Sequence, residues 1–214
     1  MRIIKNMPVA QLNRLGKIER AVKQAEKKLM PHGSLCQTDD WRLAPTDGPR
    51  AAVYMATPPL ELLELFESLR ETIDLSAYHH FADLGSGLGM ASFAAATIFE
   101  QVTGFECDER LFLKAEQIRQ QFGIANVNFL KRDFTRRPNL KDFDLVYFWK
   151  PFRDDFIHQM GKILRKTKPG TLIISRIFTD EHLFDQRRFT PIYPPDWEPS
   201  NRFHFSMFYV LARK

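Results

Sequence analysis

The residues best suited to chemistry form one glycine-rich run, Asp83-Leu84-Gly85-Ser86-Gly87-Leu88-Gly89. A short apolar segment precedes this run and a stretch of small residues, 90–99, follows it, which is the pattern of a strand, a tight turn and a helix. The three glycines permit positive φ angles and leave no side chain between the backbone and a ligand. The helix that follows begins with free N–H groups and a partial positive charge. The turn is therefore predicted to hold a carboxylate, a phosphate or an aminoacyl group.

Two further acids follow the glycine run at the ends of strand-like segments. Glu106 ends segment 101–106, near the offset of about 20 residues at which α/β nucleotide sites place their ribose-binding acid. A carboxylate can accept hydrogen bonds from both ribose hydroxyls. Asp133 follows the strand-like segment 127–130. Each acid also has a plain structural interpretation, as a solvated strand-end acid for Glu106 and as a turn or helix cap for Asp133.

A candidate ligand pocket is predicted at the end of a fourth strand. Segment 143–149 is rich in strand-forming residues and is broken at Lys150-Pro151-Phe152. Ligands of open α/β sheets bind at the carboxyl ends of the strands, so Trp149, Lys150, Pro151 and Phe152 are predicted to line that pocket. The alternative is that the aromatic residues are buried and the lysine is solvated.

The elements that must position these residues alternate between strands and helices along a chain of 214 residues. This alternation predicts an α/β fold with a doubly wound, mostly parallel sheet, made of a helical extension over residues 1–50 and a domain over 51–214. The chain has no apolar stretch of the roughly 20 residues that a membrane span needs, and its start lacks the apolar region of a signal peptide. The two cysteines lack metal-ligand spacing. We therefore expect a cytoplasmic protein without a membrane segment or a metal site.

The positive charge gathers on a predicted N-terminal helix over residues 9–30. An apolar seam runs along this helix, formed by Leu15, Ile18, Val22, Ala25 and Leu29. Lysines and arginines cover the other faces. The seam is predicted to pack on the domain or on a second copy, as a homodimer. The basic faces also suit a guide for an acidic substrate or RNA.

The glycine run resembles motif I of the class I S-adenosylmethionine-dependent methyltransferases. Met90 stands where a dinucleotide fingerprint needs its third glycine, and Lys168-Pro169-Gly170-Thr171 before an apolar strand matches another element of these enzymes. The resemblance implies a Rossmann-like sheet of seven strands with S-adenosylmethionine as cofactor. It also implies that the segment holding Tyr54 and Thr57 folds over the methionine end of the cofactor, and that Asp133 bonds to the adenine amine while its neighbour Phe134 packs on the ring. The cofactor-binding residues implied are Tyr54, Thr57, Asp83, Gly85, Ser86, Gly87, Gly89, Glu106, Cys107, Asp133 and Phe134.

The acceptor follows less directly from the sequence. Enzymes that methylate base or glutamine amide nitrogens usually have two prolines and an aromatic residue after strand four, whereas this chain has only Pro151 before Phe152. The aromatic fourth strand and the Tyr54–Thr57 segment look more like small protein-lysine methyltransferases, such as the Dot1-like enzymes and the ATP-synthase-c-subunit lysine methyltransferase group. That resemblance implies a protein lysine as the acceptor. An RNA or small-molecule methyltransferase and a non-catalytic cofactor-binding partner subunit stay open as alternatives.

Overall fold

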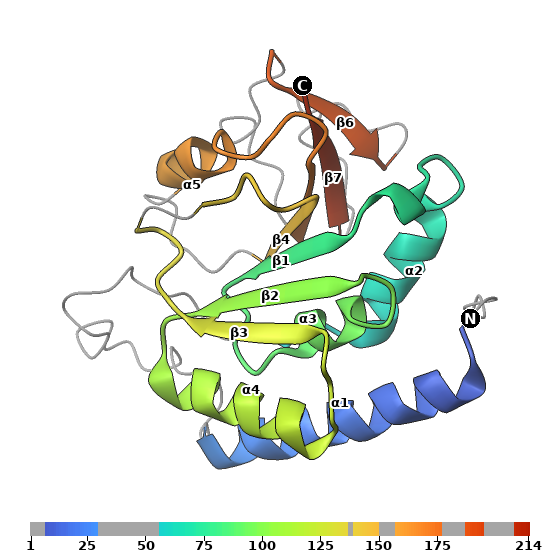
Figure 1. Ribbon diagram of the computed structural model, residues 1–214, viewed down its shortest axis with the longest axis vertical. Helices are drawn as coiled ribbons and strands as arrows, with labels where there is room; N and C mark the ends of the chain where they lie inside the picture. Colours follow the sequence, from blue (N-terminus) through green and yellow to red (C-terminus); the bar gives the residue numbers. More distant parts are fainter. Residues whose placement is uncertain (1–6, 30–55, 137–138, 150–156, 177–186, 195–207) are drawn as a thin grey trace.

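The computed structural model describes residues 7–29, 56–136, 139–149, 157–176, 187–194 and 208–214, and these form a seven-stranded sheet with helices on both faces (Figure 1). The strands are β1 (His80–Leu84), β2 (Gln101–Glu106), β3 (Val127–Lys131), β4 (Leu145–Trp149), β5 (Leu172–Arg176), β6 (Phe189–Tyr193) and β7 (Phe208–Arg213). The helices are α1 (Val9–Leu29), α2 (Pro59–Leu69), α3 (Met90–Ala95), α4 (Glu109–Gln121) and α5 (Ile157–Leu164).

The strand order in the sheet is β3-β2-β1-β4-β5-β7-β6. The first five strands run parallel, and β7 is antiparallel to both of its neighbours, β5 and β6. The strand order reverses between β1 and β4, which makes the carboxyl ends of these two strands the switch point of the sheet. This arrangement confirms the predicted doubly wound, mostly parallel sheet of seven strands.

Alternate residues of each strand face opposite layers of the molecule. Phe81 and Leu145 belong to a core cluster that includes buried residues of α1, α2, α3 and α4. Their neighbours Ala82 and Val146 belong to a second cluster, which includes buried residues of α5. One face of the sheet is thus covered by four helices and the other by α5.

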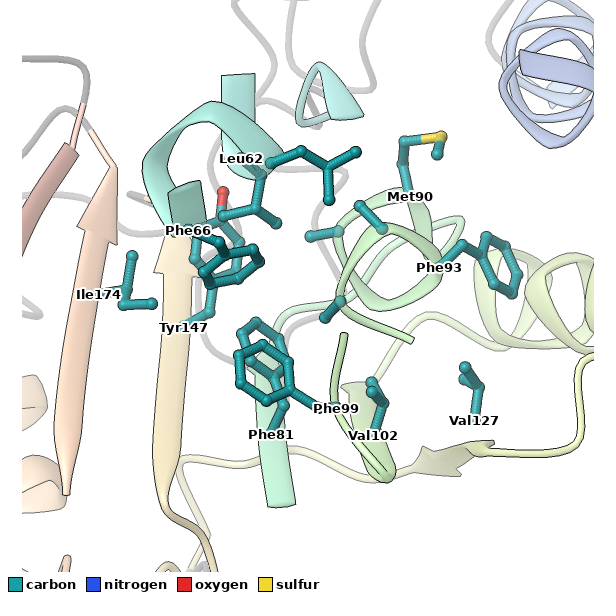
Figure 2. Packing of buried hydrophobic residues seen from close by; sticks show 14 of the residues in the cluster. Leu62, Phe66, Phe81, Met90, Phe93, Phe99, Val102, Val127, Tyr147 and Ile174 are labelled. Atoms are coloured by element: carbon teal, nitrogen blue, oxygen red, sulfur yellow. The ribbon is translucent and has the colours of Figure 1, made fainter. Parts of the chain in front are cut away.

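Aromatic rings join the first of these clusters to α2, as Figure 2 shows. The ring of Phe66 meets those of Phe81 and Phe99 edge to face, at centroid distances of 6.2 and 5.1 Å. Phe81 in turn stacks on Tyr147 of β4, with ring centroids 6.1 Å apart. Phe66 and Tyr147 are both fully buried, so the row of rings from Phe66 through Phe81 to Tyr147 holds α2 over the switch point.

Helix α1 packs on the same chain, lying along α4 and against α3 (Figure 1). Its seam residues Leu15, Ile18, Val22 and Ala25 are all buried in the first core cluster. Arg14 adds a polar tie, because its Nη2 donates to the carbonyl oxygens of Phe122 and, at 3.2 Å, of Gly123 just after α4. The seam is therefore covered by the domain itself, and a homodimer through α1 stays a prediction.

One element end differs from the sequence predictions. Helix α3 ends at Ala95 rather than at 99, and the chain turns there with the Thr97 hydroxyl bonded to the Ala94 carbonyl. Local hydroxyl-to-backbone bonds of this kind compete with helix continuation. The final strand runs from Phe208 to Arg213. None of the helices that the structure describes combines the length and apolarity needed to cross a bilayer.

Candidate cofactor and acceptor site

The candidate site lies at the carboxyl ends of the parallel strands, on the face covered by α2 and α3. Asp83 shares the alternation of Phe81, and Glu106 shares that of Val102, so both acids point to this face. Trp149 and Arg176 follow the same alternation at the ends of β4 and β5. Residues far apart in the chain thus come to the same face and the same end of the sheet.

The glycine turn folds back on β2. The backbone N–H groups of Gly85 and Ser86 both donate to the Phe105 carbonyl, at 2.9 Å each. The φ angles of Gly85, Gly87 and Gly89 are 81°, 54° and 84°, a region that side chains with a Cβ adopt at a cost. The three glycines are therefore required by the path of the backbone, as predicted.

Phe129 of β3 fills the space beneath the turn. A Cβ atom at Gly89 would lie 2.4 Å from Cζ of Phe129, and one at Gly104 would lie 2.6 Å from its Cδ1. Both contacts are too short for carbon atoms, so the close approach of the turn to β2 and β3 depends on glycine at both positions. Neither Gly104 nor Phe129 was among the predicted site residues.

Glu106 is buried, and its carboxylate bonds to the backbone of both the glycine turn and the residue before α4. Its Oε2 accepts from the Gly87 N–H at 2.8 Å, and its Oε1 accepts from the Asp108 N–H at 2.8 Å. Burial raises the pKa of Glu106, and these backbone hydrogen bonds offset part of that rise. A carboxylate oxygen can accept more than one hydrogen bond, and binding of the ribose hydroxyls by Glu106 stays a prediction.

Asp83 ties β1 to α3. Its Oδ2 accepts from the Ser92 hydroxyl at 2.6 Å, and the residue is only 2% exposed. Burial raises the pKa of Asp83 to about 7, against the opposing effect of the Ser92 bond and with a small further rise from the nearby Glu106 charge. Asp83, the first acid of the motif, thus positions α3 behind the turn. Ser92 was not among the predicted site residues.

The predicted residues on the adenine side sit in a loop after β3. The Oδ1 of Asp133 accepts from the Thr135 N–H at 2.9 Å, and its Oδ2 pairs with Arg136 Nε at 3.2 Å. Phe134 is buried in the second core cluster, and Cys107 is exposed just after β2. Adenine binding by these residues stays a prediction.

Thr57 reaches the end of β4. Its hydroxyl lies 2.7 Å from the Tyr147 hydroxyl, and both residues are buried. Because Tyr147 pairs in register with Asp83, this bond brings the segment before α2 to the switch point. The other residues predicted for the methionine end and the acceptor pocket, Tyr54 and Lys150-Pro151-Phe152, lie outside the described residues.

A buried cation, Arg176, lies at the carboxyl end of β5. Arg176 pairs in register with Trp149, and its guanidinium carbon lies 4.2 Å from the centroid of that ring. Its Nη2 also donates to Oε2 of Glu61 in the first turn of α2. Arg176 was not predicted as a site residue. Its place at the end of the apolar segment 172–176 could have indicated a role, because arginine is rarely buried.

The chain matches a family model described as "Methyltransferase domain" over residues 76–192, which is more than half of its length. Comparison with curated protein sequences found no match. Among solved structures, the chain is similar to an RNA methyltransferase from Salinibacter ruber in complex with S-adenosyl-L-homocysteine (24% identity, 73% of this chain and 91% of that chain, TM-score 0.50).

Two other solved structures extend the comparison. Magnesium protoporphyrin IX methyltransferase from Synechocystis PCC 6803 with bound S-adenosylmethionine is 16% identical over 73% of this chain and 79% of that chain, with a TM-score of 0.52. The YcgJ protein from Bacillus subtilis is 21% identical over 54% of this chain, with a TM-score of 0.45, and the chain spans only 50% of its length. At these identities the likeness concerns the fold.

The residues present fit the cofactor that this family uses. The Ser86 hydroxyl is buried and bonds to no atom of the described residues, so the turn retains a polar group for a ligand. The glycines place no side chain on the turn, and Glu106 offers a buried carboxylate that bonds to it. The family model, the strand order and this turn agree: the fold is similar to that of the two methyltransferases solved with S-adenosylmethionine or S-adenosyl-L-homocysteine, and the chain belongs to the methyltransferase-domain family.

Proposed function

We propose that the chain methylates the side-chain amine of a protein lysine, with transfer at the carboxyl ends of β4 and β5. The observation that carries this proposal is the place of Trp149. It ends β4, directly beside β1 and its glycine turn, and it is partly buried on the face where the acids of the turn lie. The adenine and ribose residues lie toward β2 and β3, so the side of β4 and β5 is left for the acceptor.

The aromatic surroundings of that end suit an amine acceptor. When bound, S-adenosylmethionine supplies an electrophilic methyl group on a positively charged sulfur. A lysine amine has a pKa of about 10.4 in water, and its protonated form has no lone pair for attack. Trp149 and the buried Phe208 would remove water from an entering amine, which disfavours the charged form and lowers the pKa of that amine.

Tyr147 orders this end of the sheet without acting as a base. Burial raises the pKa of Tyr147, against the opposing effect of its hydrogen bond with Thr57, so the phenol stays protonated at neutral pH. The bond fixes the start of α2 against β4. Alignment and desolvation of the nucleophile are then the main contributions of the protein, and no dedicated general base is required.

The test is to incubate the full chain with methyl-labelled S-adenosylmethionine and a lysate of its host, and to separate protein, RNA and small molecules. We expect label in protein that hydrolyses to methyllysine, with a rate that rises between about pH 7 and 9 as the amine loses its proton. Trp149→Ala should lower turnover far more than cofactor affinity. Leu113→Ala, on the exposed side of α4, is the control and should change neither.

Three results would contradict the proposal. Label found only in RNA or only in small molecules would assign the acceptor to that class. Cofactor binding without any transfer would favour a non-catalytic partner subunit. Unchanged turnover of Trp149→Ala on the true acceptor would show that β4 does not shape the pocket.

A further inference from the structure

We propose that Arg176 binds a carboxylate group of the acceptor, placed beside the lysine that is methylated. This inference rests on the proposed function in one respect, namely that the acceptor enters at the ends of β4 and β5. It adds a chemical requirement on the acceptor, an acidic group close to the reacting amine. The argument starts from the hydrogen-bonding state of the guanidinium.

Arg176 is buried to a degree that is rare for an arginine, with 3% of its surface exposed. Within the part of the chain that the structure describes, Glu61 accepts a hydrogen bond from Nη2, whereas the buried Nε and Nη1 donate to no atom. A guanidinium carries five N–H donors, and buried donors left unbonded are costly. Donor capacity therefore remains at a position that water reaches poorly.

The surroundings of Arg176 hold the guanidinium firmly for a ligand. Its carbon lies 4.2 Å from the centroid of the Trp149 ring and 5.4 Å from that of Phe208, so two aromatic faces contact the cation. The pairing of β4 with β5, in which Trp149 is the partner of Arg176, fixes the backbone of Arg176. Because the group is placed before any ligand arrives, little ordering is needed when an oxyanion binds.

The charge balance favours a carboxylate over a phosphate. Glu61 lies against the same guanidinium with a side chain that is 40% exposed. Its negative charge repels a second anion, and it repels a phosphate of charge near −2 more strongly than a carboxylate of charge −1. The contact with Glu61 also shows that a carboxylate fits against this guanidinium.

The position of Arg176 assigns the oxyanion to the acceptor rather than to the cofactor. The glycine turn and Glu106 join β1 to β2, whereas Arg176 stands on β5, with β4 between it and β1. The methionine carboxylate of the cofactor is the other source of the same chemistry. The experiment must therefore separate the two sources.

The experiment follows the side-chain Nε–H resonance of Arg176 by NMR in the full chain, assigned by its loss in Arg176→Lys. Sodium acetate, sodium phosphate and S-adenosylmethionine are titrated separately, with sodium chloride holding the ionic strength constant. We expect acetate to shift this resonance saturably and more effectively than phosphate, and the cofactor to leave it in place. Glu61→Gln should tighten acetate binding severalfold, because it removes the competing carboxylate without removing the arginine.

The second readout is methyl transfer to the labelled protein fraction. Arg176→Lys keeps the charge but loses the planar donors, and it should lower transfer by about 10–100-fold, the effect of hydrogen bonds to a charged group. Cofactor affinity should stay unchanged. Arg213→Lys is the matched control, since Arg213 also stacks on an aromatic ring, that of Phe189, but follows Ala212, which pairs with Leu172 at the opposite end of β5.

Each other outcome overturns the proposal in a distinct way. A resonance that no anion moves would show that Arg176 is only structural. A shift caused by the cofactor, with weaker cofactor binding in Arg176→Lys, would assign the group to the methionine carboxylate, and a preference for phosphate would point to a phosphorylated acceptor. Because the titration requires no turnover, failure of the lysine proposal in the lysate assay is seen separately.

Discussion

Two carboxylates are buried at the glycine turn, and the chain itself holds each of them. Glu106 accepts from two backbone N–H groups and Asp83 from the Ser92 hydroxyl. Burial raises the pKa of both groups. At the scale of single residues, these acids therefore shape the site before they contact any ligand, and each role leads to a separate measurement.

Replacing Glu106 with glutamine should weaken cofactor binding. The amide keeps one acceptor oxygen, so one of the N–H groups of Gly87 and Asp108 would face an NH₂ group instead. We expect a loss of about 1.5–3 kcal/mol, or roughly 10–100-fold in Kd, measured by calorimetry with S-adenosylmethionine. Glu109→Gln is the control, because Glu109 is exposed in the first turn of α4 and pairs with Lys131. Equal affinities of the two variants would remove Glu106 from the site.

Asp83 should make the folded protein less stable as the pH rises. Its pKa is about 7 in the folded chain, against an ordinary value of 3.8, so the folded state keeps a proton that the unfolded state releases. The free energy of unfolding therefore falls between those two pH values and then levels off. In Asp83→Asn this contribution is absent.

The check is urea unfolding of the wild type and Asp83→Asn at several pH values. The variant should gain stability relative to the wild type as the pH rises from about 4 to about 7. Glu106, whose pKa is also raised, adds a fall of the same direction to both proteins, so the difference between the two profiles reports chiefly on Asp83. Parallel pH profiles would contradict the assignment to Asp83.

At the scale of elements, the site depends on how closely the turn approaches β2 and β3. The turn bonds to the Phe105 carbonyl of β2, and Phe129 of β3 fills the space below Gly89 and Gly104. Helix α2 is held over the same strand ends by the Thr57–Tyr147 bond and by the Phe66 ring. Strands β2 and β3 and helix α2 thus together fix the position of the turn and of the strand ends beside it.

Gly89→Ala should destabilise the fold more than Gly123→Ala. Both glycines have positive φ, of 84° and 58°, so both variants incur backbone strain. The new Cβ at Gly89 would lie 2.4 Å from Phe129, whereas Gly123 has no atom within 4 Å of that position. We expect a difference of about 1–3 kcal/mol, the usual cost of overpacking, in urea unfolding.

A double-variant cycle separates the clash from other effects. Phe129→Leu removes ring atoms beneath the turn, so it should recover part of the loss in Gly89→Ala. Cofactor binding should fall in Gly89→Ala and persist in Gly123→Ala. Additive effects of the two substitutions would show that Phe129 does not limit the turn.

At the scale of the whole molecule, helix α1 is part of the folded body. Its seam is buried in the cluster that also contains residues of β1, β4 and β5. The outer side of α1 carries exposed lysines and arginines, and the chain has a net charge of +5. That exposed basic side is suited to attracting an acidic acceptor over a distance, in keeping with the carboxylate proposed at Arg176.

Ile18→Ala should lower the stability of the entire domain. Ile18 is 4% exposed within the core, and truncation of a buried isoleucine costs about 2–5 kcal/mol. Thermal unfolding should remain a single transition at a lower midpoint. Lys17→Ala, on the exposed side of the same helix turn, should change stability by about 0.5 kcal/mol or less. A separate early transition in Ile18→Ala would show instead that α1 unfolds independently.

The sequence alone determined the glycine turn, the acid that ends β2 and the alternation of strands and helices along the chain. These features are local, since positive φ angles, strand alternation and the spacing from Gly89 to Glu106 follow from neighbouring residues. The seam of α1 was also readable, because helical periodicity shows which side is apolar. Periodicity could not say whether that seam would meet the domain or a second copy.

Only the tertiary structure decided what surrounds the chemistry. Glu61 and Arg176 are 115 residues apart and Thr57 and Tyr147 are 90 apart, yet each pair is bonded at the strand ends. The register of β4 against β5 brings Arg176 to Trp149, and no local pattern encodes that register. Since a shift of one residue would turn these side chains to the opposite face, the acceptor end exists only once the sheet and α2 have packed together.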